Sequence, residues 1–68
     1  MKDNDIPPLV KRLRERMNLT QEQFAQAVGV TFSTVNQWEN GRRRPQPFLL
    51  KRLIEMEAEL SQNKKNER

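Results

Sequence analysis

Residues 20–45 read TQEQFAQAVGVTFSTVNQWENGRRRP, and this stretch decides the fold. It holds two short helical patterns separated by Gly29, and three consecutive arginines follow the second pattern. Glycine takes up a positive φ without the Cβ penalty that other residues incur, so it ends the first helix and turns the chain. The stretch therefore predicts two helices that cross steeply, with the second projecting outward next to a basic loop.

The residues at the helix ends support this prediction. Thr20 and Gln23 have the spacing of a capping box, in which each side chain bonds the backbone N–H of the other. Thr31 is expected to cap the second helix of the pair. Ala25 lies four residues before Gly29 and is small enough for the second helix to lie across it. These features together favour a tightly joined helix pair.

Two more helices are predicted outside the pair. Val10, Leu13 and Met17 recur at helical spacing, which predicts a helix over residues 7–17. A longer helix is expected from Pro47 to about Leu60. Its apolar residues form two ridges, which either both pack into the core or leave one ridge for a partner chain: Phe48, Leu49, Leu50, Leu53, Ile54, Met56 and Leu60.

No segment shows the alternation of a strand, so the predicted fold class is all-α, with four helices. The domain is expected to span residues 7–60. Residues 1–6 are interpreted as a flexible leader, and residues 61–68 as a disordered tail. The second helix of the glycine-joined pair is expected over about residues 31–40.

Composition narrows the function. The 68 residues allow one domain, and the net charge is +4. Residues 1–54 hold ten Lys and Arg against five Asp and Glu, so the basic part contains the glycine turn. Clustered basic charge indicates a polyanionic partner, although solubility alone is the alternative explanation.

Several classes of function are disfavoured. The chain has neither cysteine nor histidine, which removes thiolate and imidazole metal ligands and the commonest general base. No apolar run approaches the length of a membrane span. We therefore expect a cytoplasmic protein without enzymatic activity, metal or cofactor.

Four short motifs lie along residues 9–47: Val10-x-x-Leu13-Arg14, Leu19-Thr20-Gln21-x-x-Phe24-Ala25, Val28-Gly29-Val30-Thr31, and Thr34-Val35-x-x-Trp38-Glu39-Asn40-Gly41 followed by Arg42-Arg43-Arg44-Pro45. In these motifs the chain resembles the phage repressor/Cro-like helix-turn-helix family, also called XRE-type transcriptional regulators. The resemblance implies a small lambda-repressor-like bundle of four or five helices. The chain departs from the family pattern after Pro47, where one long helix is expected in place of the family's short fourth helix and fifth helix.

The resemblance implies that the third helix enters the major groove of DNA. Ser33 and Gln37 face outward and are the first candidates for base contacts, and Gln37 suits adenine. Phe32 either presses on a thymine methyl group or packs at the edge of the core. Asn36 and Thr31 are secondary candidates, and Thr31 is alternatively only the helix cap.

Phosphate contacts are expected around this helix. Gln21 resembles a phosphate-contacting residue of the family at the positive end of a helix dipole, or is an ordinary solvated side chain. Thr34 is a candidate donor. Asn40 either contacts phosphate or only ends the helix. The basic loop completes the set, with at least one member expected to be merely solvated: Arg42, Arg43 and Arg44.

The resemblance further implies a structural ion pair between Arg14 and Glu39. It implies a bacterial or phage-encoded, sequence-specific regulator that binds double-stranded DNA as a homodimer on near-palindromic operators, and that is associated with the nucleoid when bound. Two alternatives stay open. One is an antitoxin-type regulator that also binds a toxin through its last helix, and the other is a protein-interaction module that has kept the fold.

Overall fold

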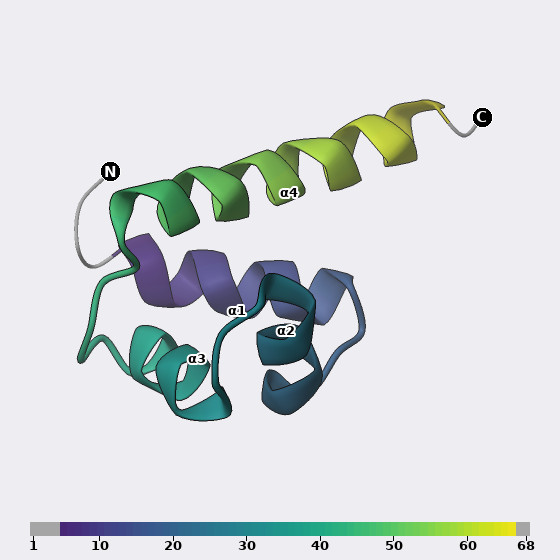
Figure 1. The fold of residues 1–68 in the computed structure, drawn as a ribbon. Coiled ribbons are helices and arrows are strands. Elements are labelled where there is room, and N and C mark those ends of the chain that lie inside the picture. The colour runs from purple at the N-terminus through teal and green to yellow at the C-terminus, as the bar shows by residue number, and fades with distance from the viewer. Residues whose placement is uncertain (1–4, 67–68) are drawn as a thin grey trace.

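The computed structural model describes residues 5–66, with side chains as far as Ser61. This part of the chain forms four helices and no strand, so the predicted all-α class is confirmed. Helix α1 lies in the middle, with α4 along one side of it and the α2–α3 pair along the other (Figure 1). The helices are α1 (Ile6–Arg16), α2 (Gln21–Val28), α3 (Phe32–Glu39) and α4 (Pro47–Asn66).

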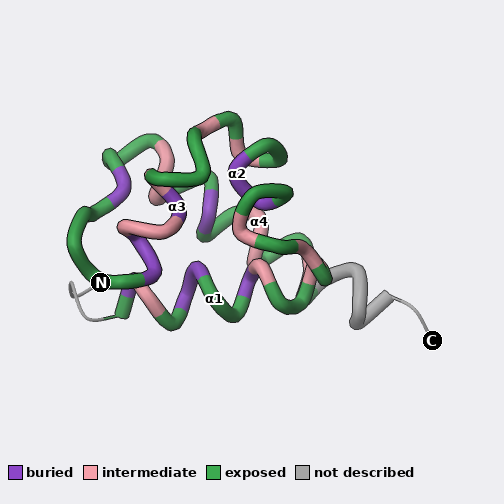
Figure 2. Tube along the Cα trace, turned by 90° about the horizontal axis from the view of Figure 1, so that it is seen from below, coloured by how far each residue is buried: buried purple, intermediate pink, exposed green. Residues whose placement is uncertain are grey.

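The core forms where α1 meets the helix pair. Buried segments of α1, α2 and α3 face one another in the view from below (Figure 2). Among the residues whose side chains the structure describes, Leu53 is the one residue of α4 in this core. The core cluster consists of Ile6, Leu9, Val10, Leu13, Phe24, Ala25, Val35, Trp38 and Leu53. The helix pair is therefore packed more completely than α4.

The start of α1 differs from the prediction. The helix begins at Ile6, and this residue is fully buried, so it belongs to the core and not to the leader. Pro7 and Pro8 stand in the first turn, where a missing N–H costs nothing. Asp5 makes no side-chain capping bond. The rest of the predicted leader, residues 1–4, lies outside the described residues.

The end of α4 also differs from the prediction. The helix continues to Asn66, past the expected end at Leu60, so residues 61–66 are helical and not part of a disordered tail. No glycine or proline follows Pro47, and Glu, Ala, Leu, Gln and Lys are good helix formers. Residues 67–68 lie outside the described part. Neither α4 nor any other described helix is long and apolar enough to cross a membrane.

Candidate nucleic-acid interface

The turn between α2 and α3 has the predicted chemistry. At the start of α2, the Gln23 backbone N–H donates to Thr20 Oγ1 at 3.1 Å, and the Thr20 N–H donates to Gln23 Oε1 at 3.0 Å. At its end, Gly29 has a φ of 95°, and its N–H donates to the Ala25 carbonyl at 2.8 Å. A Cβ at Gly29 would meet no atom within 4 Å, so backbone conformation and not space requires this glycine.

The start of α3 is held by two threonines. The Thr34 backbone N–H donates to Thr31 Oγ1 at 3.2 Å, so Thr31 is the helix cap. The two hydroxyl oxygens lie 2.9 Å apart in a shared hydrogen bond. Thr31 is exposed and Thr34 is half-buried. The cap therefore uses much of the hydrogen-bonding capacity of both candidates, and their DNA contacts stay predictions.

The outer side of α3 is polar and uncharged. Val35 and Trp38 are fully buried against the core, and Ser33 and Gln37 lie on the opposite side of the helix. Ser33 is exposed and Gln37 is half-buried. Phe32 is 48% exposed and lies outside the core cluster, so its ring is available at the surface. This arrangement leaves one side of α3 free to lie along another molecule.

Two of the predicted contact residues bond each other. Asn40 Nδ2 donates to Asn36 Oδ1 at 2.8 Å, one helical turn along. The i, i+4 spacing is the sequence signal that could have revealed this bond. The bond uses one of the two lone pairs of the Asn36 carboxamide oxygen, and both amide hydrogens of Asn36 stay available to a further partner.

A buried network joins α3 to α1. Glu39, only 5% exposed, accepts from Arg14 Nε at 2.7 Å and from Arg14 Nη2 at 3.2 Å. Arg14 Nη1 also donates to the Leu19 carbonyl at 3.2 Å. The hydrogen bond to Glu39 raises the pKa of Arg14 above its usual value, despite the opposing effect of desolvation. The structure thus contains the ion pair that the family resemblance implied.

Gln21 belongs to the same network, which sequence reasoning missed. Its Nε2 donates to Glu39 Oε1 at 3.0 Å. Gln21 is the first residue of α2, so this bond ties the start of α2 to the end of α3. The amide has a second N–H that this bond does not use. A phosphate contact by Gln21 is therefore compatible with its structural bond, and the purely solvated alternative does not describe it.

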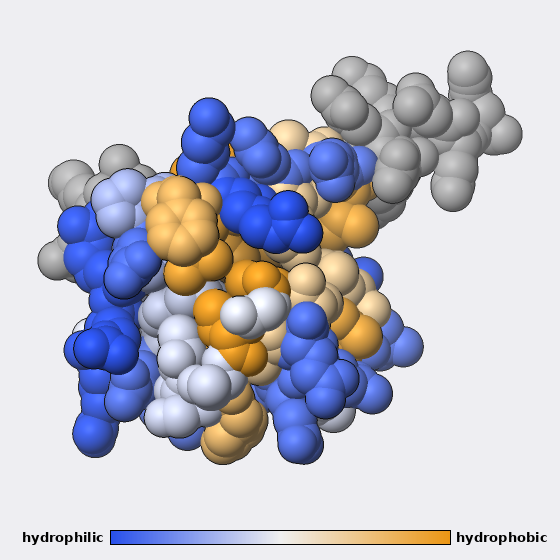
Figure 3. Space-filling view, in the orientation of Figure 1, coloured by the Kyte–Doolittle hydropathy of each residue, from blue (hydrophilic) through white to orange (hydrophobic). Residues whose placement is uncertain are grey.

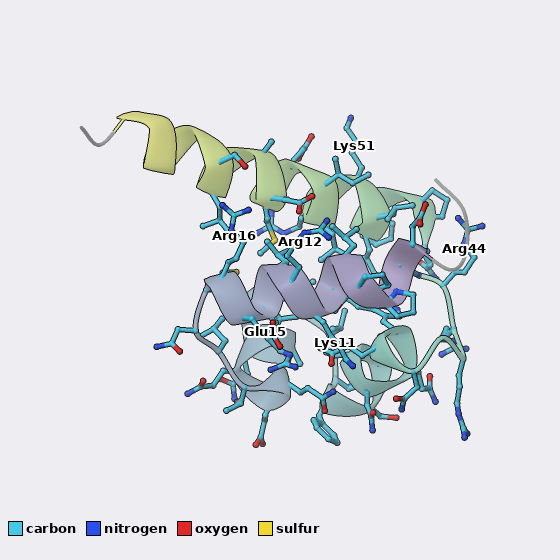
Figure 4. The ribbon with its side chains drawn as sticks, turned by 180° about the vertical axis from the view of Figure 1, so that it is seen from behind. Lys11, Arg12, Glu15, Arg16, Arg44 and Lys51 are labelled. Atoms are coloured by element: carbon cyan, nitrogen blue, oxygen red, sulfur yellow. The ribbon has the colours of Figure 1, made fainter. Side chains whose placement is uncertain are left out.

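The basic loop begins at the end of α3. Gly41 has a φ of 75°, and the Arg42 backbone N–H donates to the Gln37 carbonyl at 2.9 Å. Arg42 and Arg43 are exposed next to this anchored turn. Arg44 lies close to the start of α4 (Figure 4), and together with Arg43 it lines a pocket beside Thr34 and Trp38 of α3. The structure therefore places the arginine loop next to α3.

A capped helix pair with a glycine turn, a free polar side on its second helix and an adjoining basic loop defines a helix-turn-helix DNA-binding module. A family model described as Helix-turn-helix matches residues 10–56. The chain therefore belongs to this family, the XRE-type, phage repressor/Cro-like helix-turn-helix proteins.

The chain is also similar to part of a longer protein. It is 38% identical over 58 residues to the type II methyltransferase M.SsoII of Shigella sonnei. The match covers 81% of this chain, which spans only 15% of the methyltransferase. No solved structure gave a significant match.

Proposed function

We propose that the protein is a sequence-specific, double-stranded DNA-binding transcriptional regulator that inserts α3 into the major groove. The observation that carries this proposal is the uncharged polar side of α3 lying free beside an anchored arginine loop. Short polar side chains suit base edges, and arginines suit phosphates. The Glu39 network supports the reading, because it fixes α3 to α1 and to the start of α2.

Base reading is assigned first to Ser33, Gln37 and Phe32. The Gln37 carboxamide can bond adenine N6 and N7 together, and the Phe32 ring can lie on a thymine methyl group. Asn36 is a secondary candidate: while it accepts from Asn40, its two amide hydrogens can donate to an acceptor such as guanine O6 or thymine O4. Thr31 is a secondary candidate.

Phosphate binding is assigned to groups around the edge of α3. Gln21 offers its second amide hydrogen at the positive end of the α2 dipole. Thr34 and Asn40 are further candidates. Arg42 and Arg43 supply the main electrostatic attraction, and Arg44 adds charge at the α4 end of the loop. These contacts position the protein without reading sequence.

We further propose that two copies bind a near-palindromic operator as a homodimer, because one helix-turn-helix reads a single half-site. Similarity to part of a methyltransferase supports a module that also occurs within larger proteins. Methyl transfer is not carried over, and no catalytic step enters this proposal. Co-purification of an untagged protein would instead favour the antitoxin-type alternative.

The first experiment is selection from a random duplex library with the intact chain. We expect enrichment of two related half-sites at a fixed spacing. Gln37→Ala should then cost about 1–3 kcal/mol per half-site and relax the preference at one position. Gln26→Ala, at an exposed position of α2 outside the proposed contacts, is the matched control. An equal loss on all sequences would refute base reading by Gln37, and no enrichment would refute sequence-specific binding.

The second experiment measures how binding depends on salt. Replacing both Arg42 and Arg43 by alanine should reduce the slope of log K against log salt by about two counterions per subunit. The slope isolates phosphate contacts, because a folding defect lowers affinity without removing counterion release. An unchanged slope in the folded double variant contradicts this role.

A further inference from the structure

We propose that α4 forms an antiparallel contact with α4 of a second copy through one flank, which we call the Ile54 seam: Leu50, Ile54, Ala58 and Ser61. This inference rests on the homodimer proposed above and adds to it the surface and the orientation. Nothing in the DNA-reading geometry uses these residues. Leu50 also packs partly against the core, so the seam begins at the edge of the face by which α4 packs on α1.

The seam is a continuous stripe without charge. Its residues recur at spacings of four, four and three, which places them on one side of the helix. Ile54 is 42% exposed, Leu50 is half-buried, and Ala58 and Ser61 are exposed. The small side chains of the latter two allow a second helix to approach closely. Burial of the exposed Ile54 side chain against a partner would remove apolar surface from water.

The opposite flank of α4 is less suited to self-association. Apolar side chains also gather on that face of the molecule, between α4 and the α2–α3 turn (Figure 3). Leu49, Met56 and Leu60, however, are all partly packed against the core, whereas Leu50 is the one described seam residue that packs there. Beside Met56, at helical spacing, lie the charged residues Arg52 and Glu59. Ile54 has the charged residues Lys51 and Glu57 at the same kind of spacing, but Glu57 is already paired with Arg12 of α1.

The charges of α4 select the orientation. Lys51 and Arg52 precede Ile54, and Glu55, Glu57 and Glu59 follow it. In an antiparallel pair centred on Ile54, Lys51 of one copy lies within about 3 Å, along the helix axis, of Glu55 of the other. A parallel pair would instead oppose like charges. Among the described residues, Lys51 and Glu55 have no other ion-pair partner.

The inner border of the seam is already fixed. Arg12 Nε of α1 donates to Glu57 Oε2 at 2.7 Å. Figure 4 shows this side of the molecule, with Arg12 between α1 and α4 and Lys51 at the outer edge of α4. The uncharged stripe therefore lies between an ion pair on one side and Lys51 with Glu55 on the other. Dimer seams commonly have such charged borders.

The position of the seam also suits DNA binding. Leu53 points at α1, and Ile54 is the next residue, about 100° further around the helix. A partner on Ile54 thus lies to the side of the line from α4 to α1. A two-fold axis relates the two copies, and in an antiparallel pair it is perpendicular both to α4 and to the line that joins the two α4 helices. It therefore runs roughly along the direction from α4 to α1. Because α2 and α3 lie beyond α1 (Figure 1), both copies of α3 face the same way.

The contact is short, so we expect the dimer to be weak. From Leu50 to Ser61 the seam extends about 17 Å. Such a length gives a small interface, typical of weak association. We expect the free chain to dimerise only at tens to hundreds of micromolar, and an operator with two half-sites to hold the copies together at lower concentration.

Cysteine cross-linking of the intact chain tests both surface and orientation, since the natural sequence has no cysteine. Ile54→Cys places the thiols of two copies opposite each other on the two-fold axis, and we expect rapid disulfide formation. Ala58→Cys should not cross-link to itself, because its copies lie about 12 Å apart along the axis, beyond disulfide reach. A mixture of Leu50→Cys and Ala58→Cys should cross-link. Arg52→Cys, exposed on the opposite flank, is the control.

Each outcome decides the inference. Rapid cross-linking of Ile54→Cys with slow reaction of Ala58→Cys and Arg52→Cys supports it. Equal reaction of Ile54→Cys and Ala58→Cys indicates a parallel pair, and preferential reaction of Arg52→Cys indicates the other flank; either overturns it. Failure of Ile54→Cys to react up to about 1 mM protein also overturns it.

A charge exchange gives a second readout. Lys51→Glu should weaken the dimer in sedimentation at least tenfold, and Lys51→Glu with Glu55→Lys should restore it. Loss without restoration contradicts the antiparallel pairing. All these measurements are made without DNA, so a failure of DNA binding leaves them readable. Dimerisation through another face would leave the DNA-binding proposal intact.

Discussion

The α2–α3 pair and α4 are held in different ways. Each end of the pair is fixed by a cap, by a glycine of positive φ or by the Glu39 network. By contrast, the described side chains of α4 include one that is fully buried, Leu53, several that pack only partly on the core, and one exposed ion pair, Arg12–Glu57. The difference indicates that contacts within the single chain determine the position of α3, whereas α4 keeps part of its apolar surface exposed.

The largest expected effect is at Glu39. Glu39→Ala leaves the partly buried Arg14 guanidinium and the Gln21 amide without their acceptor, which should cost about 3–5 kcal/mol of unfolding free energy. A domain of this size has a total stability of about 3–10 kcal/mol, so this loss is a large fraction of the total and should move unfolding to a much lower urea concentration. Urea unfolding followed by the fluorescence of Trp38, the one tryptophan, measures this.

A double variant distinguishes the cost of leaving the Arg14 charge unpaired from the cost of losing its hydrogen bonds to Glu39. Replacing the pair together, as Arg14→Met with Glu39→Leu, removes both buried charges and should recover most of the loss. Recovery would show that the stranded charge, and not the missing bond, destabilises Glu39→Ala. If Glu39→Ala unfolds at the same urea concentration as the natural chain, α3 is not fixed by this network and the contrast with α4 fails.

The second effect separates two neighbouring residues of α4. Leu53 is fully buried, so Leu53→Ala should cost about 2–5 kcal/mol of unfolding free energy. Ile54 is 42% exposed, so Ile54→Ala should change the monomer by less than about 0.5 kcal/mol. Urea unfolding at low micromolar protein, where the monomer predominates, gives both values. Equal losses would mean that α4 is packed on two sides by its own chain.

A smaller effect is expected at the turn. Gly29→Ala forces a Cβ into a φ of 95°, which should cost about 1–3 kcal/mol. Because nothing lies within 4 Å of that Cβ, the cost is conformational and not steric. Gly29→Asn should therefore lose less, since asparagine tolerates left-handed conformations. Thermal unfolding of the two variants compares them, and a larger loss for asparagine would contradict this account.

The sequence predicted the α2–α3 pair well because its signals are local. Thr20, Gln23, Gly29 and Thr31 act within one turn of where they stand, so spacing alone identifies their roles. Helix class and the apolar stripe of α1 follow from periodicity in the same way. The bounds of the helices were less predictable at their outer ends, where Ile6 is recruited into the core by packing.

What the sequence did not reveal depends on contacts between distant residues. The bond from Gln21 to Glu39 joins side chains 18 positions apart, and Arg12 meets Glu57 across 45 positions. No periodicity encodes such pairs. The bond between Asn36 and Asn40 was within reach of an i, i+4 argument. The extension of α4 was missed because a polar composition was interpreted as disorder, although those residues are good helix formers.

The smallest effect is expected at the ion pair between α1 and α4. The hydrogen bond and charge of Glu57 raise the pKa of Arg12 above its usual value. Its side chain is nevertheless 52% exposed, and water screens the pair. Arg12→Ala should therefore leave the urea midpoint of the monomer nearly unchanged. The same variant should weaken the dimer modestly, because it loosens the inner border of the Ile54 seam. A large loss of monomer stability would show that α4 is fixed as firmly as the helix pair, and the division between the two regions would have to be abandoned.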